Sequence, residues 1–410
     1  MNSKERLLGV WRGDAVDYIP LTTWCFGLRA PEHLRWQQGG SARTFWYSLR
    51  MEHIHTLPQP WDLEDDFRRV LAWQSLGVDD VLDVSVPWSI HPAVTWEDRR
   101  LEPGARAAEP VLVRSYQTPS GPLEHAVRRT GEDPGPGWVV QPEVVPLFED
   151  YSIPRAVKHA VASPADIAPV LHLYAPPDEN ARAWFAGRIA RVNQFATTHG
   201  VAVQAWSAFG MDAVIWLTGV EGAIMMAMDH PTVFGELVDA VLRTDLARTA
   251  LAASSPGVDL IVGRGWYSST DFWSPRLFDR FVYPCIAALA AEAHRYGKPF
   301  AYTMTTGVEQ LGRRLIDAGV DVLYFADPVQ DLASLERVRD LLGGHLALVG
   351  GTNALTLASG DPARIHQEVE HAMRVLGPTG RFILHPVDAL FPDTPWSGVE
   401  TLIEAWRAAL

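Results

Sequence analysis

The sequence predicts an α/β fold, a (β/α)8 TIM barrel that carries a β-rich insertion. From Ser163 onward, apolar runs of strand length alternate with stretches of helical periodicity, which is the pattern of parallel βα units. The chain contains about eight such runs, the number of strands that closes this kind of barrel. Residues 94–150 interrupt the alternation with strands and Pro/Gly turns. We therefore expect one domain over residues 1–410 with the insertion inside it.

Start signals and apolar periodicity place the individual elements. Ser3 reads as the N-cap of a first helix that ends near Trp11. Ser-Pro or Asp-Pro pairs at 163–164, 274–275 and 361–362 mark later helix starts, because proline is favoured in the first helical turn. The predicted strands are 18–23, 81–84, 201–206, 260–262, 300–304, 322–325, 346–349 and 382–384.

Composition excludes several classes of protein. The formal net charge of -14 argues against a surface for nucleic acid or anionic membrane. Two cysteines, Cys25 and Cys285, cannot build a disulfide framework and fit a reducing compartment. The polar N-terminus lacks an apolar signal-peptide core, and no apolar run approaches the ~20 residues of a membrane span. We expect a cytoplasmic protein.

Candidate site residues follow the strands, because barrel enzymes place their chemistry at the carboxyl ends of the strands. His385 and Asp388 follow the last strand and are the main catalytic candidates, with Tyr302 as a third. An aspartate that follows a strand can instead cap the next helix. The expected substrate-binding residues are Arg264, Trp266, Tyr267, Trp206, Thr303, Thr305, Asp327 and Asn353.

Arg264 stands beside two aromatic residues, Trp266 and Tyr267. A guanidinium in such a setting favours recognition of a carboxylate or another anionic group on an aromatic ligand. The alternative is an ion pair between Arg264 and an acid at the barrel mouth, and the sequence leaves both open.

Two segments carry a family resemblance. The last strand leads through His385 and Asp388 into Pro392-Asp-Thr-Pro395, and the chain opens with Ser3-Lys-Glu-Arg followed by Asp17-Tyr-Ile-Pro20. Both segments resemble the uroporphyrinogen decarboxylase superfamily, which includes methyltransferases that work with corrinoid proteins. The resemblance implies a TIM barrel whose β-rich insertion covers the barrel mouth.

The chain departs from both branches of that superfamily. After the first strand, Trp24-Cys-Phe-Gly-Leu-Arg29 replaces the arginine-rich R-Q-A-G-R loop of the decarboxylase, and Val86 falls where its central carboxylate would stand, with Asp83 the nearest acid. The zinc-binding H-x-C of the methyltransferases falls on Thr303-Met-Thr305, and Asp388 takes the place of their last-strand cysteine. A porphyrinogen substrate and a zinc-activated thiol acceptor are therefore both disfavoured.

Two chemistries remain for His385 and Asp388. With Asp327 they could form an N/O site for a harder ion or zinc, or they could act without metal, Asp388 orienting His385 for proton transfer. We expect a small-molecule methyltransferase or O-demethylase that acts on an aromatic or anionic compound and works with a separate corrinoid protein. The alternatives are a decarboxylase, in which Arg264 holds a carboxylate and His385 protonates the carbanion, and a non-catalytic binding barrel. A homodimer is a further expectation.

Overall fold

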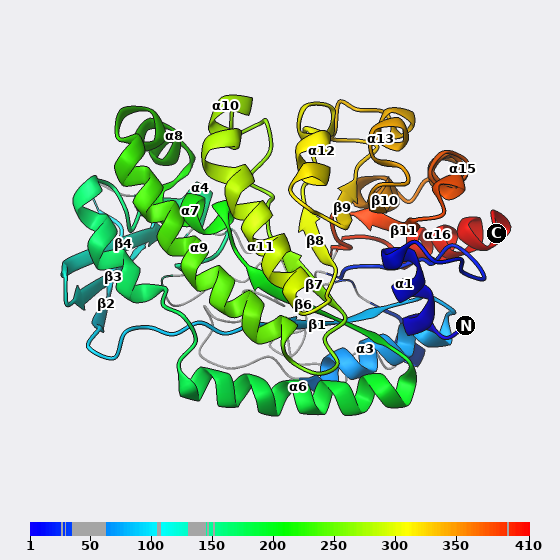
Figure 1. The fold of residues 1–410 in the computed structure, drawn as a ribbon, viewed down its shortest axis with the longest axis horizontal. Helices are drawn as coiled ribbons and strands as arrows, with labels where there is room; N and C mark the ends of the chain where they lie inside the picture. Colours follow the sequence, from blue (N-terminus) through cyan, green and yellow to red (C-terminus); the bar gives the residue numbers. More distant parts are fainter. Residues whose placement is uncertain are drawn as a thin grey trace.

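Seven parallel strands form the central sheet of the molecule (Figure 1). In this computed structural model, residues 1–25, 28, 30–34, 63–104, 108–129, 145, 147–150, 152–391 and 393–410 are described. The strands follow one another in chain order across the sheet, and every one of them is buried along its whole length. They are β1 (Val81–Ser85), β6 (Ala202–Ala208), β7 (Leu260–Gly263), β8 (Phe300–Thr303), β9 (Val322–Ala326), β10 (Ala347–Asn353) and β11 (Phe382–Val387).

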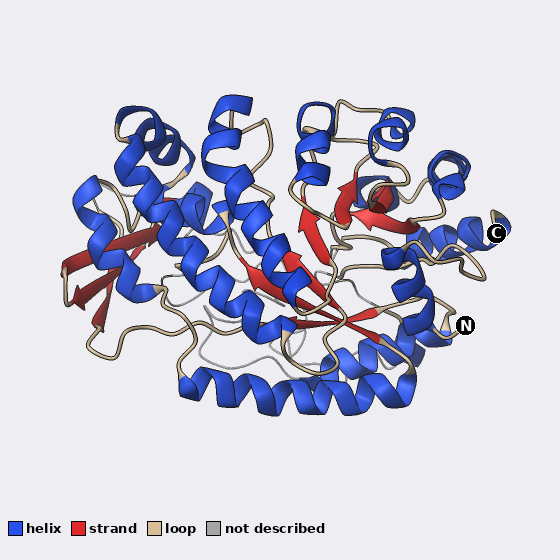
Figure 2. Cartoon of the chain, viewed as in Figure 1, coloured by secondary structure: helices blue, strands red, loops and turns tan. Residues whose placement is uncertain are grey.

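Helices connect successive strands and surround the sheet (Figure 2), as parallel sheets require, because both of their faces must be covered. The longer helices are α1 (Ser3–Arg12), α3 (Leu63–Ser75), α6 (Glu179–His199), α7 (Met211–Thr218), α8 (Val220–Asp229), α9 (Pro231–Ala253), α11 (Tyr283–Arg295), α12 (Val308–Asp317), α13 (Leu335–Leu342), α15 (Pro362–Leu376) and α16 (Trp396–Ala408). Shorter ones are η1 (Glu32–Leu34), α4 (Ser152–Arg155), η3 (Pro164–Asp166), α5 (Ile167–Val170), η4 (Leu171–Leu173), α10 (Pro275–Leu277), the π-helix η5 (Phe278–Val282), α14 (Ala354–Ala358) and η6 (Gly377–Thr379).

Side-chain caps fix several of the helix starts. The side chains of Ser274 and Asp361 accept hydrogen bonds from backbone N–H groups in the first turns of α10 and α15, as predicted. The first helix is capped one residue earlier than expected: Asn2, not Ser3, is the N-cap, and it forms a capping box with Glu5.

The predicted strand 18–23 is not a strand in the structure. Its backbone makes one isolated parallel bridge to β11, between Leu21 and Leu384, and the Leu21 carbonyl accepts from the N–H of Asp79 just before β1. Cys25, just beyond the segment, makes a second bridge to Leu390, which follows β11. Pro20 has no N–H to donate, so a continuous ladder cannot form through it. The expected complete eight-stranded barrel is therefore not confirmed, and the sheet is a curled, open half-barrel of seven strands.

A second, antiparallel sheet lies beside the first. It consists of β2 (Thr95–Leu101), β3 (Val111–Thr118), β4 (Gly121–Arg128) and β5 (Ala156–Lys158), in that order. Figure 1 shows this sheet on the side of the molecule opposite the two termini. Its residues Tyr116 and Leu123 pack into the main apolar core, so the two sheets share buried surface.

Helix length and composition also bear on membrane insertion. Over the described part of the chain, no single helix is long and apolar enough to cross a membrane. Only α7 and α8 taken together pass that test, and the two are bent by 102° relative to each other.

Candidate active site

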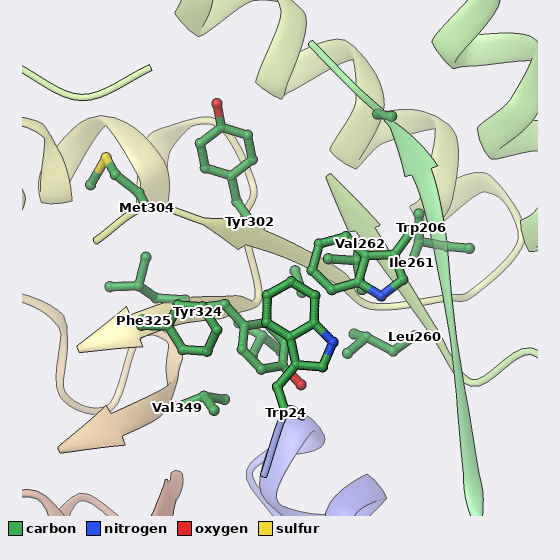
Figure 3. Packing of buried hydrophobic residues seen from close by; sticks show 14 of the residues in the cluster. Trp24, Trp206, Leu260, Ile261, Val262, Tyr302, Met304, Tyr324, Phe325 and Val349 are labelled. Atoms are coloured by element: carbon green, nitrogen blue, oxygen red, sulfur yellow. The ribbon is translucent and has the colours of Figure 1, made fainter. Parts of the chain in front are cut away.

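Three tryptophans from different elements form an aromatic array inside the half-barrel. Trp24 lies in the loop that contacts β11, Trp206 lies on β6, and Trp266 follows β7. The centroids of their rings are 5.5, 5.6 and 5.8 Å apart in pairs, and the interplanar angles are 11° to 19°. Figure 3 shows Trp24 and Trp206 next to each other among the apolar side chains of the neighbouring strands. Trp206 and Trp266 were predicted site residues, and the structure brings them together.

Asp83 on β1 lies in a buried polar network beneath this array. Its Oδ1 accepts hydrogen bonds from Trp206 Nε1 at 2.6 Å and from Gln204 Nε2 at 2.5 Å. The side-chain Oε1 of Gln204 in turn accepts from the Tyr324 hydroxyl at 3.0 Å. Burial raises the pKa of Asp83 to about 7, although Arg69 acts in the opposite direction. The network anchors the Trp206 ring by its indole nitrogen.

Arg264, directly after β7, is held by acids. Its Nε donates to Asp212 Oδ2 at 3.0 Å, and its Nη2 lies 3.5 Å from Asp150 Oδ2. The guanidinium also lies over the rings of Trp216 and Trp266, at 4.9 and 4.4 Å from their centroids. Of the two sequence-based interpretations of Arg264, the ion pair with a nearby acid is the one that the structure contains.

Asp212 and Asp150 tie the neighbouring loops to the same guanidinium. Asp212, in the first turn of α7, is fully buried and accepts from the Tyr267 backbone N–H at 3.0 Å; burial raises its pKa to about 6, against the effect of Arg264. Asp150 Oδ1 accepts from the Tyr267 hydroxyl and from Trp216 Nε1, both at 2.8 Å. Tyr267 is thereby engaged at both its backbone and its hydroxyl.

Asp388 lies at the end of β11 in the same electrostatic environment. Burial raises its pKa to about 7; Arg264 and the Trp266 indole lower it, whereas Asp150 and Asp327 raise it further. The carboxyl oxygen Oδ1 is buried and has no hydrogen-bond partner among the residues that the structure describes. A substantial fraction of Asp388 is therefore protonated at neutral pH.

His385, on β11, is buried with 3% of its surface exposed. Its Nδ1 is 2.9 Å from the Thr22 hydroxyl, and its ring stacks on Phe325 with centroids 5.1 Å apart. Burial lowers its pKa to about 3, so the imidazole is neutral at physiological pH. This disagrees with the sequence-based idea of His385 as an acid and base near pH 7, because an apolar, buried ring disfavours the charged form.

Asp327 directly follows β9, Asn353 is the last residue of β10, and the two side chains are bonded to each other. Asp327 Oδ1 accepts from Asn353 Nδ2 at 2.9 Å and from the backbone N–H of Val329 and Gln330, and Asn353 caps α14 through Leu355 N–H. Asn353 is therefore a helix cap, whereas Asp327 binds the N–H groups of a turn, and the next helix, α13, is capped by Ser334 instead. The other oxygen, Asp327 Oδ2, is buried and unpaired within the described residues, and burial raises the pKa of this carboxyl.

The β8 candidates lie apart from this group. The Tyr302 hydroxyl donates to Ser268 Oγ at 2.7 Å, and Figure 3 shows its ring pointing away from Trp24. Thr303 is fully buried, accepts from Gly265 N–H at 2.9 Å and donates to the Gly263 carbonyl at 3.2 Å, so it fastens the turn after β7. Thr305 is half-buried beyond the strand end. The structure does not bring the Tyr302 hydroxyl to Asp388.

Four buried polar atoms at the carboxyl ends of β7, β9 and β11 lack a hydrogen-bond partner of normal distance and angle within the described part of the chain, although the Trp266 indole is close enough to Asp388 to lower its pKa. They are Trp266 Nε1, Asp327 Oδ2, His385 Nε2 and Asp388 Oδ1. Buried polar atoms are almost always paired in folded proteins, and clusters of unpaired ones mark sites that bind water or ligands. The group offers neutral donors and acceptors rather than a fixed positive charge.

Several residues of this region were not among the sequence candidates: Thr22, Trp24, Asp83, Asp150, Asp212 and Trp216. Asp212 carried a usable signal, because it is an acid only four residues beyond the end of β6, where candidate site residues are sought. Asp150 and Thr22 carried none, since their roles depend on contacts with residues far away in sequence.

The donor set can be tested against a zinc ion, which proteins hold with three or four side chains. Among the residues whose placement is described, no group of three or more His, Cys, Asp and Glu side chains is arranged to hold a metal ion. His385 Nδ1 is already bonded to Thr22, which leaves one nitrogen and the Asp388 carboxyl. These residues do not fit a zinc site.

Comparison with known proteins identifies the family. The family model described as uroporphyrinogen decarboxylase (URO-D) matches residues 147–409, more than half of the chain. The chain belongs to the uroporphyrinogen decarboxylase family. Its fold is similar to that of a solved structure, a methyltransferase from Methanosarcina mazei, with a TM-score of 0.56 and 16% identity over 100% of this chain and 99% of that one. A search of curated proteins found no match.

Proposed function

We propose that this protein is a small-molecule O-demethylase or methyltransferase that transfers a methyl group to a corrinoid carried by a separate protein. Membership of the uroporphyrinogen decarboxylase family supports an enzyme, and the site supports the reaction type. The observation that carries the proposal is Asp388: a carboxyl group with a pKa of about 7 and a buried, unpaired oxygen, beside aromatic rings.

Asp388 would act as the general acid. Cleavage of a methyl ether breaks a C–O bond, and the departing oxygen is a better leaving group when it receives a proton as the methyl group leaves. A carboxyl group with a pKa near 7 is protonated often enough at neutral pH to supply that proton. The corrinoid supplies the nucleophile that takes the methyl group. The Trp24, Trp206 and Trp266 rings would provide a flat apolar surface for an aromatic substrate.

The proposal needs no metal ion. Asp388 carries the acid function, and His385, neutral and buried, would contribute a hydrogen bond rather than a proton. Arg264 would act by holding Asp212 and Asp150 in place, and its positive charge also limits the pKa of Asp388.

We further propose that residues 20–25 are an irregular extended segment that takes the position of the eighth barrel strand, and that residues 1–410 form a single domain. The bridge between Leu21 and Leu384 of β11 and the bond from Asp79 N–H to the Leu21 carbonyl support this, because they connect the segment to β11 on one side and to the residues just before β1 on the other. The antiparallel sheet β2–β5 would be the insertion of that domain over the barrel mouth. The sequence has only two cysteines, too few for a disulfide framework, and this supports a cytoplasmic enzyme.

The decarboxylase alternative is less well supported. It requires Arg264 to hold a substrate carboxylate, yet two acids already contact that guanidinium. It also requires a protonated His385, and burial lowers the pKa of His385 to about 3.

The test is methyl transfer to chemically reduced free cobalamin. Purified protein is incubated with a panel of aromatic methyl ethers, methylcobalamin is followed by absorbance, and quenching of tryptophan fluorescence reports binding. We expect transfer from at least one ether, and Asp388→Asn to reduce the rate by about 10²- to 10⁴-fold.

The matched control is Asp340→Asn, an exposed acid that pairs with Arg339 on α13, which should keep the wild-type rate. An ether that binds without transferring its methyl group would contradict the proposal, as would full activity in the Asp388→Asn protein. Release of carbon dioxide from an aromatic acid without cobalamin would favour the decarboxylase.

A further inference from the structure

The imidazole of His385 is bonded to Thr22 at Nδ1, whereas Nε2 is buried and has no hydrogen-bond partner of normal distance and angle among the described residues. The backbone of Asp388 lies close enough to the ring to raise its pKa, although burial outweighs this effect. Thr22 Oγ1 lies 2.9 Å from Nδ1, and both side chains are buried, at 5% and 3% exposure. Thr22 is fixed in turn by its backbone, because its N–H donates to the Leu384 carbonyl at 3.0 Å while Leu384 N–H donates to Pro20 at 2.9 Å. The hydroxyl therefore reaches β11 from a segment that is aligned with it.

The ring surroundings keep His385 uncharged. Phe325 stacks on it, the Tyr324 ring lies edge-on at 6.4 Å, and no carboxylate is bonded to either ring nitrogen within the described residues. An imidazolium without a counter-charge in such a place would be costly. The neutral ring then carries one proton, on Nδ1 or on Nε2.

Hydrogen-bond accounting distinguishes the two tautomers. With the proton on Nε2, the Thr22 hydroxyl donates to Nδ1 and is satisfied. With the proton on Nδ1, the Thr22 oxygen must accept, and its own O–H has no other acceptor among the described residues. The first arrangement leaves only the Nε2–H unpaired, whereas the second leaves both the Thr22 O–H and the Nε2 lone pair unpaired, and native structures avoid additional buried unpaired groups.

We propose that Thr22 is a positioning residue that fixes His385 as the Nε2–H tautomer, so that the ring presents a neutral N–H donor to the substrate. The choice of tautomer follows from the geometry alone; the identity of the recipient as the ether oxygen rests on the proposed function. His385 Nε2 and the protonated Asp388 would then both donate to the oxygen on which negative charge develops as the methyl group leaves.

This tautomer also bears on metal binding. A protonated Nε2 has no lone pair for an ion, whereas a histidine that binds a metal through Nε2 carries its proton on Nδ1 and donates it to a neighbouring acceptor. The tautomer of His385 therefore tells whether Nε2 can act as a hydrogen-bond donor or as a metal ligand.

The experiment is long-range ¹H–¹⁵N correlation NMR of the histidine rings in the full chain, without substrate. The chain has 14 histidines, so the His385 signals are assigned by their loss in His385→Gln. We expect Nδ1 to have the shift of a non-protonated nitrogen and Nε2 that of a protonated one. The reverse assignment, or an imidazolium pattern at pH 7, would overturn the proposal.

Two variants test the part played by Thr22. Thr22→Val keeps the shape and removes the hydroxyl, and should give averaged shifts of both tautomers; Thr22→Ser should restore the wild-type pattern. A Thr22→Val protein that keeps the pure Nε2–H pattern would refute the assignment to Thr22. With an active substrate, equal tautomer populations would lower kcat by about twofold with little change in KM. Because the NMR result requires no substrate, failure of the demethylase proposal would leave it intact.

Discussion

Replacing Arg264 with methionine removes the cation that a fully buried acid depends on. Arg264 and Asp212 have 3% and 0% of their surfaces exposed, and Nε donates to Oδ2 at 3.0 Å. Methionine retains much of the aliphatic contact with Trp216 and Trp266 but leaves Asp212 without a counter-charge. Breaking a buried ion pair on one side costs about 3–5 kcal/mol, and we expect a loss of that size in the free energy of unfolding at pH 8.

The loss should depend on pH in a defined direction. Burial already raises the pKa of Asp212 to about 6, and Arg264 opposes that rise. Without Arg264 the pKa rises further, so the folded state holds the proton of Asp212 more tightly than the unfolded state does. The stability of the variant is then greatest below the unfolded pKa near 4 and falls as pH increases through the folded pKa. The deficit relative to wild type should be smaller at pH 5 than at pH 8.

Urea unfolding followed by tryptophan fluorescence at both pH values measures this difference. Arg337→Met is the matched control, because Arg337 forms a two-point ion pair with Glu309 at 2.8 Å on the exposed surface. Because this exposed pair is screened by solvent, its removal should change the free energy of unfolding little, and by a similar amount at the two pH values. Equal losses for the two arginines, or an Arg264→Met deficit that grows toward pH 5, would refute this account of the pair.

Three further predictions concern neighbouring residues. Asp388→Asn should gain stability relative to wild type as pH rises from 6 to 9, by roughly 1–2 kcal/mol, because the pKa of Asp388 is raised to about 7; thermal denaturation across this range measures it, and a constant difference would contradict it. Gly350→Ala should lower the free energy of unfolding by about 3 kcal/mol, because φ is +143° and the new Cβ would lie 2.4 Å from the Ala326 carbonyl oxygen. A urea midpoint near that of wild type would contradict this and show that the backbone there can shift to make room. Asn353→Ala should lower the free energy of unfolding by about 1–3 kcal/mol, because it removes a helix cap and a bond to Asp327. Guanidinium unfolding measures this loss, and Ser359→Ala, at an exposed residue, is the comparison.

Local sequence was sufficient for most of the strands and for the family. Seven of the eight predicted strands occur within a few residues of their expected bounds, because fully buried parallel strands are continuous apolar runs bounded by turn residues. The eighth, 18–23, failed because proline and an irregular register allow only isolated bridges there.

The positions of the candidate site residues were also visible in the sequence, since the carboxyl ends of parallel strands meet at one edge of a sheet. His385, Asp388, Asp327, Asn353 and Arg264 could be selected on that ground alone. What each side chain touches could not, because hydrogen bonds and ion pairs are made with residues up to hundreds of positions away, as between Thr22 and His385.

The sequence by itself determined a parallel α/β architecture, the family and the strand ends at which to look. Only the tertiary structure decided the surroundings of His385 and Asp388, and with them the direction in which each pKa shifts. Burial disfavours charge on both groups: it lowers the pKa of His385 and raises that of Asp388. Burial depends on which distant segments pack around a side chain, and that information is absent from any local pattern.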